Sequence, residues 1–250
     1  MRKFLLLAAA FCCAAGLGRL ARADDDTKPI LEKAIKAHGG MEKLQKLKKM
    51  AVQSRAKGKI QQLGGIDITL ETSAQDDKSR QVIEGEVANT KFKQVVLLDG
   101  KKLRTFVNGQ EYKLDDKKLQ KEIEERIYAE KVTGLVFFQE KGYKLSPLGE
   151  AMVNGKPALG IRVSSEGHRD VNLFFDKDKG FLVKTETRAA DLMSGEEKTE
   201  EKVLQDYKQQ DGYFLPTRVT VLQDGKELLS LEIEEIKFVD RFDEETFTKP

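Results

Sequence analysis

The stretch Ile66-Asp67-Ile68-Thr69-Leu70-Glu71 alternates apolar and polar side chains, which is the pattern of a β-strand with one buried face and one wet face. The same alternation returns at 229–234, where Leu and Ile alternate with Ser and Glu. Similar spacing places further apolar residues on one strand face each: Phe92, Val96 and Leu98, and then Leu159, Ile161 and Val163. The sequence therefore predicts a sheet with one apolar face and one charged face.

Tight-turn dipeptides separate these stretches. They are Asp99-Gly100, Asn108-Gly109, Asn154-Gly155, Asp211-Gly212 and Asp224-Gly225. Such pairs tolerate the positive φ angles of hairpin turns, so neighbouring strands should run antiparallel. We expect a curled meander of about ten strands, a size at which side chains can leave a hollow inside.

Helical spacing is confined to two regions. Thr27-Lys28-Pro29 is a plausible cap for a helix over 30–37, which His38-Gly39-Gly40 ends, and Leu44 with Leu47 indicates a second, short helix. We interpret His38 as a partner of the helix C-terminal dipole.

The second region is an amphipathic helix over 115–138. Its apolar residues are expected to face the sheet: Leu119, Ile123, Ile127, Tyr128, Val132, Leu135 and Val136. Lys118 with Glu122 and Lys121 with Glu125 should pair on the outer face. A helix of about 20 residues is roughly 30 Å long, so it can lie across a curled sheet as a lid.

The first 23 residues have the composition of a secretory signal peptide. Arg2 and Lys3 precede an apolar run, and Ala21-Arg22-Ala23 forms a cleavage site, so we expect a mature chain of one domain over 24–250. Cys12 and Cys13 lie inside the leader and lack the small preceding residue that lipoprotein processing favours. The mature chain should be exported to the periplasm or secreted, without disulfides, a lipid anchor or a transmembrane segment.

Charge excludes one class of partner. Four of the 44 basic residues lie in the leader, which holds no acidic residue, so the remaining chain has no positive excess. A nucleic-acid-binding protein needs such an excess to neutralise phosphates, and none is expected here.

A search for chemistry finds no catalytic or metal-binding motif. The two histidines, His38 and His168, are far apart in the sequence, and Ser165-Glu166-Gly167-His168-Arg169-Asp170 favours a turn over a Ser-His-Asp triad. Asp176-Lys177-Asp178-Lys179-Gly180 resembles the start of a calcium loop but lacks the distal Glu. We expect no enzyme activity, no metal and no cofactor.

The chain resembles the LolA-like superfamily of envelope proteins. The resemblance rests on phrases in a fixed order: the helix at 30–37 with His38-Gly39-Gly40, Val95 to Leu103, Phe174 to Val183, Asp206-Tyr207 with Asp211 to Pro216, and Phe242 to Phe247. It implies an incomplete, half-open antiparallel β-barrel with N-terminal helices and a central helical lid. It also implies binding of a lipid, or of the acyl chains of a lipoprotein, without chemistry. The carriers hold the lid with a strand arginine, whose nearest match here is Arg80.

On this interpretation the acyl chain contacts the inner sheet face and the lid. The expected residues are Ile66, Ile68, Leu70, Phe92, Val96, Leu98, Leu119, Ile123, Ile127, Ile161, Val163, Leu173, Phe175, Val219, Val221, Leu231 and Ile233. The alternative is a monomeric sensor or interaction module with the same fold, whose interior is filled and whose partner is an envelope protein. A close-packed interior would favour that alternative over a carrier.

Overall fold

The computed structural model describes residues 23–100, 102–112, 117–190 and 195–250, with no side-chain detail for 23–25 and 117–119. Residues 1–22 of the predicted leader lie outside this part of the chain. Ala23 is the first residue of helix α1 (Ala23–Ala37).

The thirteen strands of the described residues belong to one antiparallel sheet. They are β1 (Ala51–Ile60), β2 (Ile66–Gln75), β3 (Lys78–Val87), β4 (Thr90–Asp99), β5 (Lys102–Val107), β6 (Gln110–Tyr112), β7 (Tyr143–Val153), β8 (Lys156–Ser165), β9 (Val171–Asp176), β10 (Leu182–Ala190), β11 (Glu197–Gln210), β12 (Tyr213–Gln223) and β13 (Lys226–Val239). The expected meander is confirmed, and short strands such as β6 raise the number above ten.

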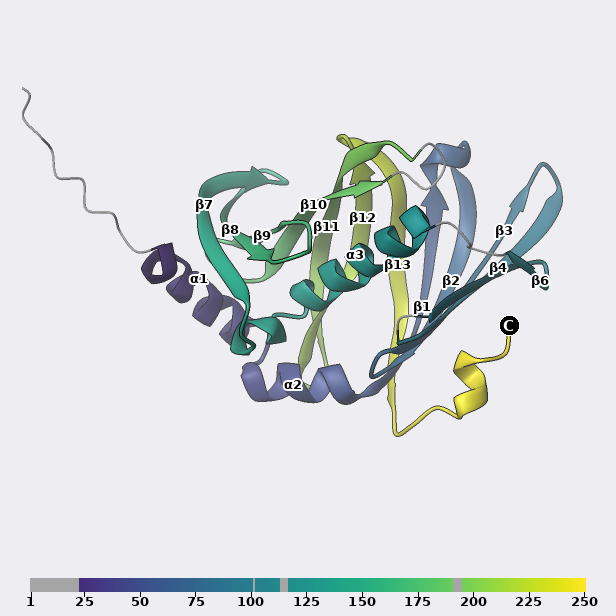
Figure 1. The fold of residues 1–250 in the computed structure, drawn as a ribbon, viewed down its shortest axis with the longest axis horizontal. Helices are drawn as coiled ribbons and strands as arrows, with labels where there is room; N and C mark the ends of the chain where they lie inside the picture. Colours follow the sequence, from purple (N-terminus) through teal and green to yellow (C-terminus); the bar gives the residue numbers. More distant parts are fainter. Residues whose placement is uncertain (1–22, 101, 113–116, 191–194) are drawn as a thin grey trace, which may run out of the picture.

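The sheet is curled but not closed. Its order runs from β6 through β1 to β13 and on to β7, so that β6 and β7 are unpaired edges (Figure 1). The pairing of β1 with β13 joins the two halves. The half-open barrel expected from the sequence is therefore present.

In the part of the chain that the structure describes, three helices and three 3-10 turns accompany the sheet. The helices are α1, α2 (Met41–Lys49) and α3 (Lys117–Thr133), and the turns are η1 (Gln61–Leu63), η2 (Val136–Gln139) and η3 (Glu244–Phe247). The predicted helix over 115–138 was too long at its C-terminal end, because Gly134 interrupts it and Leu135 adopts a left-handed φ of 61°.

The helices cover only one half of the sheet. Buried residues of α1, α2, α3 and η2 form one apolar core with β8, β9 and β10, in which Leu31, Val132, Phe137 and Leu173 are fully enclosed. Helix α1 also packs on β7. In Figure 1 the helices accordingly lie beside and across the β7–β12 side, while β2–β5 curve away from them.

Two glycines permit close packing in the other half. On β1, a Cβ at Gly58 would come within 2.7 Å of the Leu231 side chain, and on β3 a Cβ at Gly85 would meet the Phe92 ring at 2.8 Å. Both large side chains therefore lie flat over a neighbouring strand. Glycine in a strand interior commonly marks such a close approach or a bend in a barrel wall.

Strand β4 is apolar on both faces. Val95 and Leu97 form a buried cluster with Val82 and Phe106 on the face opposite the helices. The turn η3 packs on β3 and β4 at this face, with Phe247 buried. The run Val95-Val96-Leu97-Leu98 breaks the alternation because both faces of the strand are covered or apolar.

Substitutions at two adjacent residues of β2 test the two faces. Ile68 is 5% exposed, and Ile68→Asp should lower the free energy of unfolding by several kcal/mol because it buries an unpaired charge. Thr69→Asp, on the other face, should change it by about 0.5 kcal/mol or less. Urea denaturation of both variants gives the comparison, and equal losses would contradict the register.

Candidate functional site

The predicted binding residues of the strands share one face of the sheet. Register pairs Val219 with Leu231, Leu231 with Gly58, and Gly58 with Ile68, which continues through Gly85 to Phe92. A second row runs from Ile161 through Leu173, Thr185 and Lys202 to Val221. We call this face, on which the helices lie, the inner face.

Burial differs between the two halves of the inner face. In β8 and β9 the predicted residues are buried under the helices: Ile161, Val163, Leu173 and Phe175. Among the rest only Ile68 is buried, and the others are half-buried: Ile66, Leu70, Phe92, Val96, Leu98, Val219, Val221, Leu231 and Ile233. The apolar inner face thus extends well beyond the part that the helices cover.

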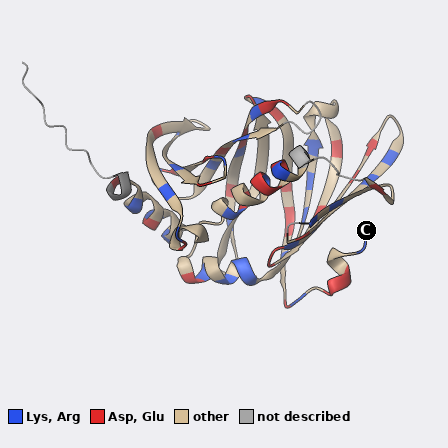
Figure 2. Cartoon of the chain, viewed as in Figure 1, with Lys and Arg blue, Asp and Glu red and all other residues tan. Residues whose placement is uncertain are grey.

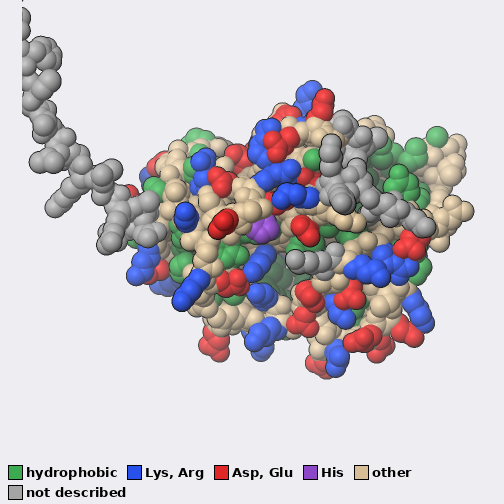
Figure 3. Space-filling view, viewed as in Figure 1, with side chains coloured by type: hydrophobic (Ala, Val, Ile, Leu, Met, Phe, Trp, Pro, Cys, Tyr) green, Lys and Arg blue, Asp and Glu red, His purple; other side chains and the backbone are tan. Residues whose placement is uncertain are grey.

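The open half ends in exposed apolar side chains. By register Val87, Val107 and Tyr112 belong to the inner face, and they are 42%, 42% and 65% exposed. Figure 3 shows hydrophobic side chains gathered at this end of the molecule, by the β3–β4 hairpin. Large exposed apolar areas of a soluble domain commonly mark a binding surface.

Helix α3 is rotated relative to the prediction. Glu122 and Glu125, expected on the outer face, are only 4% and 6% exposed, whereas Ile123 and Ile127 are half-buried. The side chain of Leu119 lies outside the described residues. The expectation that Glu122 and Glu125 face solvent was wrong, because groups on the sheet bind these carboxylates, although Lys121 does pair with Glu125. The predicted apolar residues Tyr128, Val132 and Leu135 are buried.

Those partners come from the β8–β9 loop and from β11. Arg169 Nη1 donates to Glu122 Oε2 at 2.6 Å, and the Arg169 backbone N–H donates to Glu125 Oε2 at 2.8 Å. Arg126 Nη1 donates to Glu200 Oε2 at 2.8 Å, and Lys202 pairs with Glu130. Burial opposes the charge on Arg169, but the hydrogen bond to Glu122, together with the attraction of the nearby carboxylates, outweighs it and raises the pKa of Arg169.

This ionic contact is structural. The space left between α3 and strands β10 and β11 is about 20 Å³, which is room for no more than about one water molecule. Among the described residues, no group of three or more His, Cys, Asp or Glu is placed to hold a metal ion. The charges therefore hold the helix on the sheet and leave no binding site beneath it.

Arg80, the predicted lid-holding residue, lies elsewhere. Register pairs it with Ser73 and Leu97, which places it with Val82 on the outer face, opposite α3. Arg80 therefore does not reach α3 in this arrangement. Arg169 of the β8–β9 loop and Lys202 of β11 contact acidic side chains of α3 instead, and Arg126 of α3 pairs with Glu200 of β11.

A pocket of about 350 Å³ lies where α2, the end of α3 and η2 meet strands β10–β12. Its apolar wall includes Leu44, Leu135, Phe137 and Leu204. His38, Tyr207 and Phe214 add an aromatic side, in which the rings of His38 and Tyr207 meet edge-on with centroids 5.6 Å apart. The sequence analysis missed this pocket because its lining comes from segments that are far apart along the chain.

His38 contacts the C-terminal end of α1, as the dipole interpretation expects, but burial disfavours the charged form of its ring. Burial lowers the pKa of His38 below its ordinary value of 6.5, against the smaller effect of the Ala34 carbonyl. Its Nδ1 lies 2.8 Å from that carbonyl oxygen, so Nδ1–H donates to it. The ring serves as an apolar wall with one satisfied donor.

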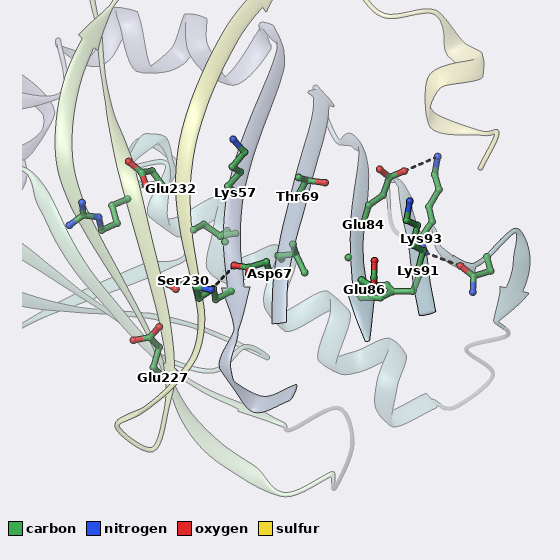
Figure 4. Close-up of a pocket in the computed structure, with 18 residues that line it drawn as sticks. Lys57, Asp67, Thr69, Glu84, Glu86, Lys91, Lys93, Glu227, Ser230 and Glu232 are labelled. Carbon is green, nitrogen blue, oxygen red and sulfur yellow. Dashed lines mark hydrogen bonds and ion pairs between the residues drawn. The ribbon is translucent and has the colours of Figure 1, made fainter. Parts of the chain in front are cut away.

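A hollow of about 1080 Å³ lies over β13 and β1–β4, lined mainly by charged side chains of the outer face and also by the predicted residues Ile68, Phe92 and Leu231. Figure 4 shows its charged side chains side by side on successive strands. Register aligns Glu232, Lys57, Thr69, Glu84 and Lys93 in one row, and Figure 2 shows the same mixture of signs along these strands. This outer trough has no excess of either charge.

Solved structures with this architecture match nearly the whole chain. A LolA superfamily protein from Nitrosomonas europaea shares 14% identity at a TM-score of 0.52, with 89% of this chain and 97% of that one covered. The chain has a LolA-like fold. A DUF1329 family protein from Desulfovibrio piger shares 12% identity at a TM-score of 0.56, over 88% and 96% of the two chains. No family model and no curated protein matches the sequence.

Among the described residues, the open half of the inner face and the 350 Å³ pocket each offer an apolar surface to a ligand. The identities are too low to assign a function, since one fold serves many functions. No helix in the described part of the chain is long and apolar enough to cross a bilayer.

The ionic contact of α3 can be tested at Arg169. Arg169→Ala leaves the buried carboxylate of Glu122 without its main partner and should lower the free energy of unfolding by about 3 kcal/mol or more. Hydrogen exchange should also speed up in α3. Arg162→Ala is the control, because its ion pair with Asp170 is exposed and should contribute at most about 1 kcal/mol. Unchanged exchange in α3 would show that packing alone holds the helix.

A lowered pKa at His38 makes folding sensitive to mild acid. Below pH 6.5 the unfolded chain takes up a proton at His38 that the folded protein resists, so the free energy of unfolding should fall between pH 7 and 5.5. In His38→Gln that part of the slope should vanish. Denaturant titrations at several pH values measure the free energy of unfolding. If it falls equally with pH in His38→Gln and in the wild type, a group other than His38 causes the pH dependence.

Proposed function

We propose that this chain is an exported envelope protein that binds the acyl chain of a lipid or lipoprotein on its inner face and performs no chemistry on it. The observation that carries the proposal is the apolar inner face of β2–β5, which remains half exposed while the other half is buried under helices. Removing such an apolar surface from water is favourable, and an acyl chain can cover it because the hydrophobic effect needs no directed contacts.

The free energy of burying an acyl chain is large enough for a lipid carrier. Burying a methylene contributes about 0.8 kcal/mol, so a chain of roughly 14 to 16 carbons offers on the order of 10 kcal/mol before association and ordering costs. The free energy that remains after these costs is compatible with micromolar binding. Because the force has no direction, chain length should matter more than the detailed shape of the lipid.

Two further features support an envelope role. The LolA-like fold is shared with a LolA superfamily protein, and the N-terminal sequence has the pattern of a cleaved signal peptide. A carrier in outer-membrane lipoprotein or lipid transport is the more specific form of the proposal. Determination of the mature N-terminus by intact-mass analysis from the native host tests the export step.

A second candidate is an interaction module that binds an envelope protein. The outer trough favours it, because rows of alternating charge across β13 and β1–β4 offer complementary contacts to a polar partner. This candidate predicts that charge reversal in the trough abolishes the interaction, whereas changes on the inner face do not affect it.

Acyl binding is tested with a fluorescent fatty acid and two variants. Val107→Glu places a carboxylate on the open inner face at a residue that is 42% exposed, so the fold should persist while affinity drops by about tenfold. Met152→Glu, at the opposite edge of the sheet, replaces a residue that is 66% exposed and is the matched control. A thermal melt of each sample checks the fold.

The outcomes are distinct. If Val107→Glu and Met152→Glu bind the probe equally well, the acyl site does not lie on the open inner face. If the wild-type protein binds no acyl probe, even after delipidation, the carrier proposal fails and the interaction module replaces it.

A further inference from the structure

The 350 Å³ pocket has a basic rim. Lys48 on α2 and Lys131 at the end of α3 both line it, above the apolar wall of Leu44, Leu135 and Phe137. Both lysines are well exposed, with side chains 52% and 42% accessible, so their ammonium groups stand at the mouth. An apolar interior with cations at its entrance is the arrangement that an anionic amphiphile requires.

One carboxylate now lies between these lysines. Lys131 Nζ donates to Glu140 Oε2 at 2.7 Å, and Lys48 Nζ lies 3.8 Å from Glu140 Oε1. Glu140 follows η2, is itself exposed, and does not line the pocket. The hydrogen bond from Lys131 lowers the pKa of Glu140, so the carboxylate is ionised at neutral pH.

The charges around the pocket leave a positive excess. Glu130 is the acidic residue that lines it, and Lys202 of β11 pairs with Glu130. Lys48 and Lys131 then share the single carboxylate of Glu140. Three lysines therefore face two carboxylates, which leaves one excess positive charge at the mouth. Exposed ion pairs are weak, so a ligand anion can replace Glu140 at the lysines.

We propose that this pocket binds a single-chain anionic amphiphile, with its acyl chain against the apolar wall and its anion at Lys48 and Lys131, the counter-ions that Glu140 occupies in the free protein. The shared chemistry is a carboxylate or phosphate on one acyl chain. The volume lies near the lower end of the range for ligand pockets, about 300–1,000 Å³, which suits one chain rather than two. This inference rests on the proposed function and specifies its ligand.

Because Glu140 occupies the two lysines in the free protein, its removal should raise the affinity for an anionic ligand, whereas removal of a ligand-binding residue lowers it. When the ligand arrives, its anion replaces the Glu140 carboxylate, so Glu140 competes with the ligand. Removing the negative charge of Glu140 should strengthen binding, while removing the positive charge of Lys131 should weaken it. If Glu140 and Lys131 served only to stabilise the fold, the two substitutions would not change ligand affinity in opposite directions.

The experiment is calorimetric titration of the delipidated protein with myristate, tetradecyl phosphate and the neutral methyl ester of myristate. Wild type should bind the two anions about tenfold more tightly than the ester. Lys131→Gln should lower affinity for the anions by about fivefold, and Glu140→Gln should raise it by about threefold. Binding of the ester should be the same in both variants. The stronger of the two anions identifies the head group as carboxylate or phosphate.

Lys46→Gln is the matched control, because Lys46 is an exposed lysine of α2 that does not line the pocket. It should bind all three ligands as the wild type does, and thermal melts should show that every variant is folded. Equal affinity for ester and anions, or equal behaviour of Lys131→Gln and Lys46→Gln, would overturn the inference while acyl binding itself stands. Absence of binding by all three ligands would overturn the proposed function as well.

Discussion

The structure depends on an imbalance between a large apolar face and the helices available to cover it. One continuous inner face crosses the strands from β4 to β8, but the helices of the described residues pack on the side formed by β7–β12. On that side Ile161, Val163 and Leu173 are fully enclosed. On the other side the same face is left half exposed. The hydrophobic effect that builds the core therefore also leaves a surface that can bind an apolar ligand.

Helix α3 joins the packed side by two unlike forces. Tyr128 and Val132 anchor it in the apolar core, while Glu122 and Glu125 meet the β8–β9 loop through Arg169. Buried ion pairs add little net stability, because desolvation offsets their attraction, but breaking one leaves an uncompensated charge. The ion pairs therefore fix the position of α3 on the sheet, which apolar contacts alone would leave less defined. That confinement leaves the half-exposed face of β2–β5 uncovered.

Alternation along the strands was enough to predict which residues share a face. The fourteen strand residues expected to contact a ligand do lie on the inner face, since register in an antiparallel sheet preserves the period of two. Alternation was not enough for α3 or for Arg80. An acidic residue on a helix has the same local pattern whether it meets solvent or a buried Arg, and Arg80 was matched by analogy without its strand parity.

The sequence by itself determined the antiparallel meander, the hairpin turns and the inner face, because those features follow from side-chain periodicity and from backbone angles that Gly, Asn and Asp tolerate. Only the tertiary structure decided how far the helices cover that face and where the pocket at Lys48 and Lys131 forms. Both depend on contacts between residues far apart in the chain, such as Lys48 with Glu140. Such contacts leave no local periodic signal, so they become visible only once the chain has folded.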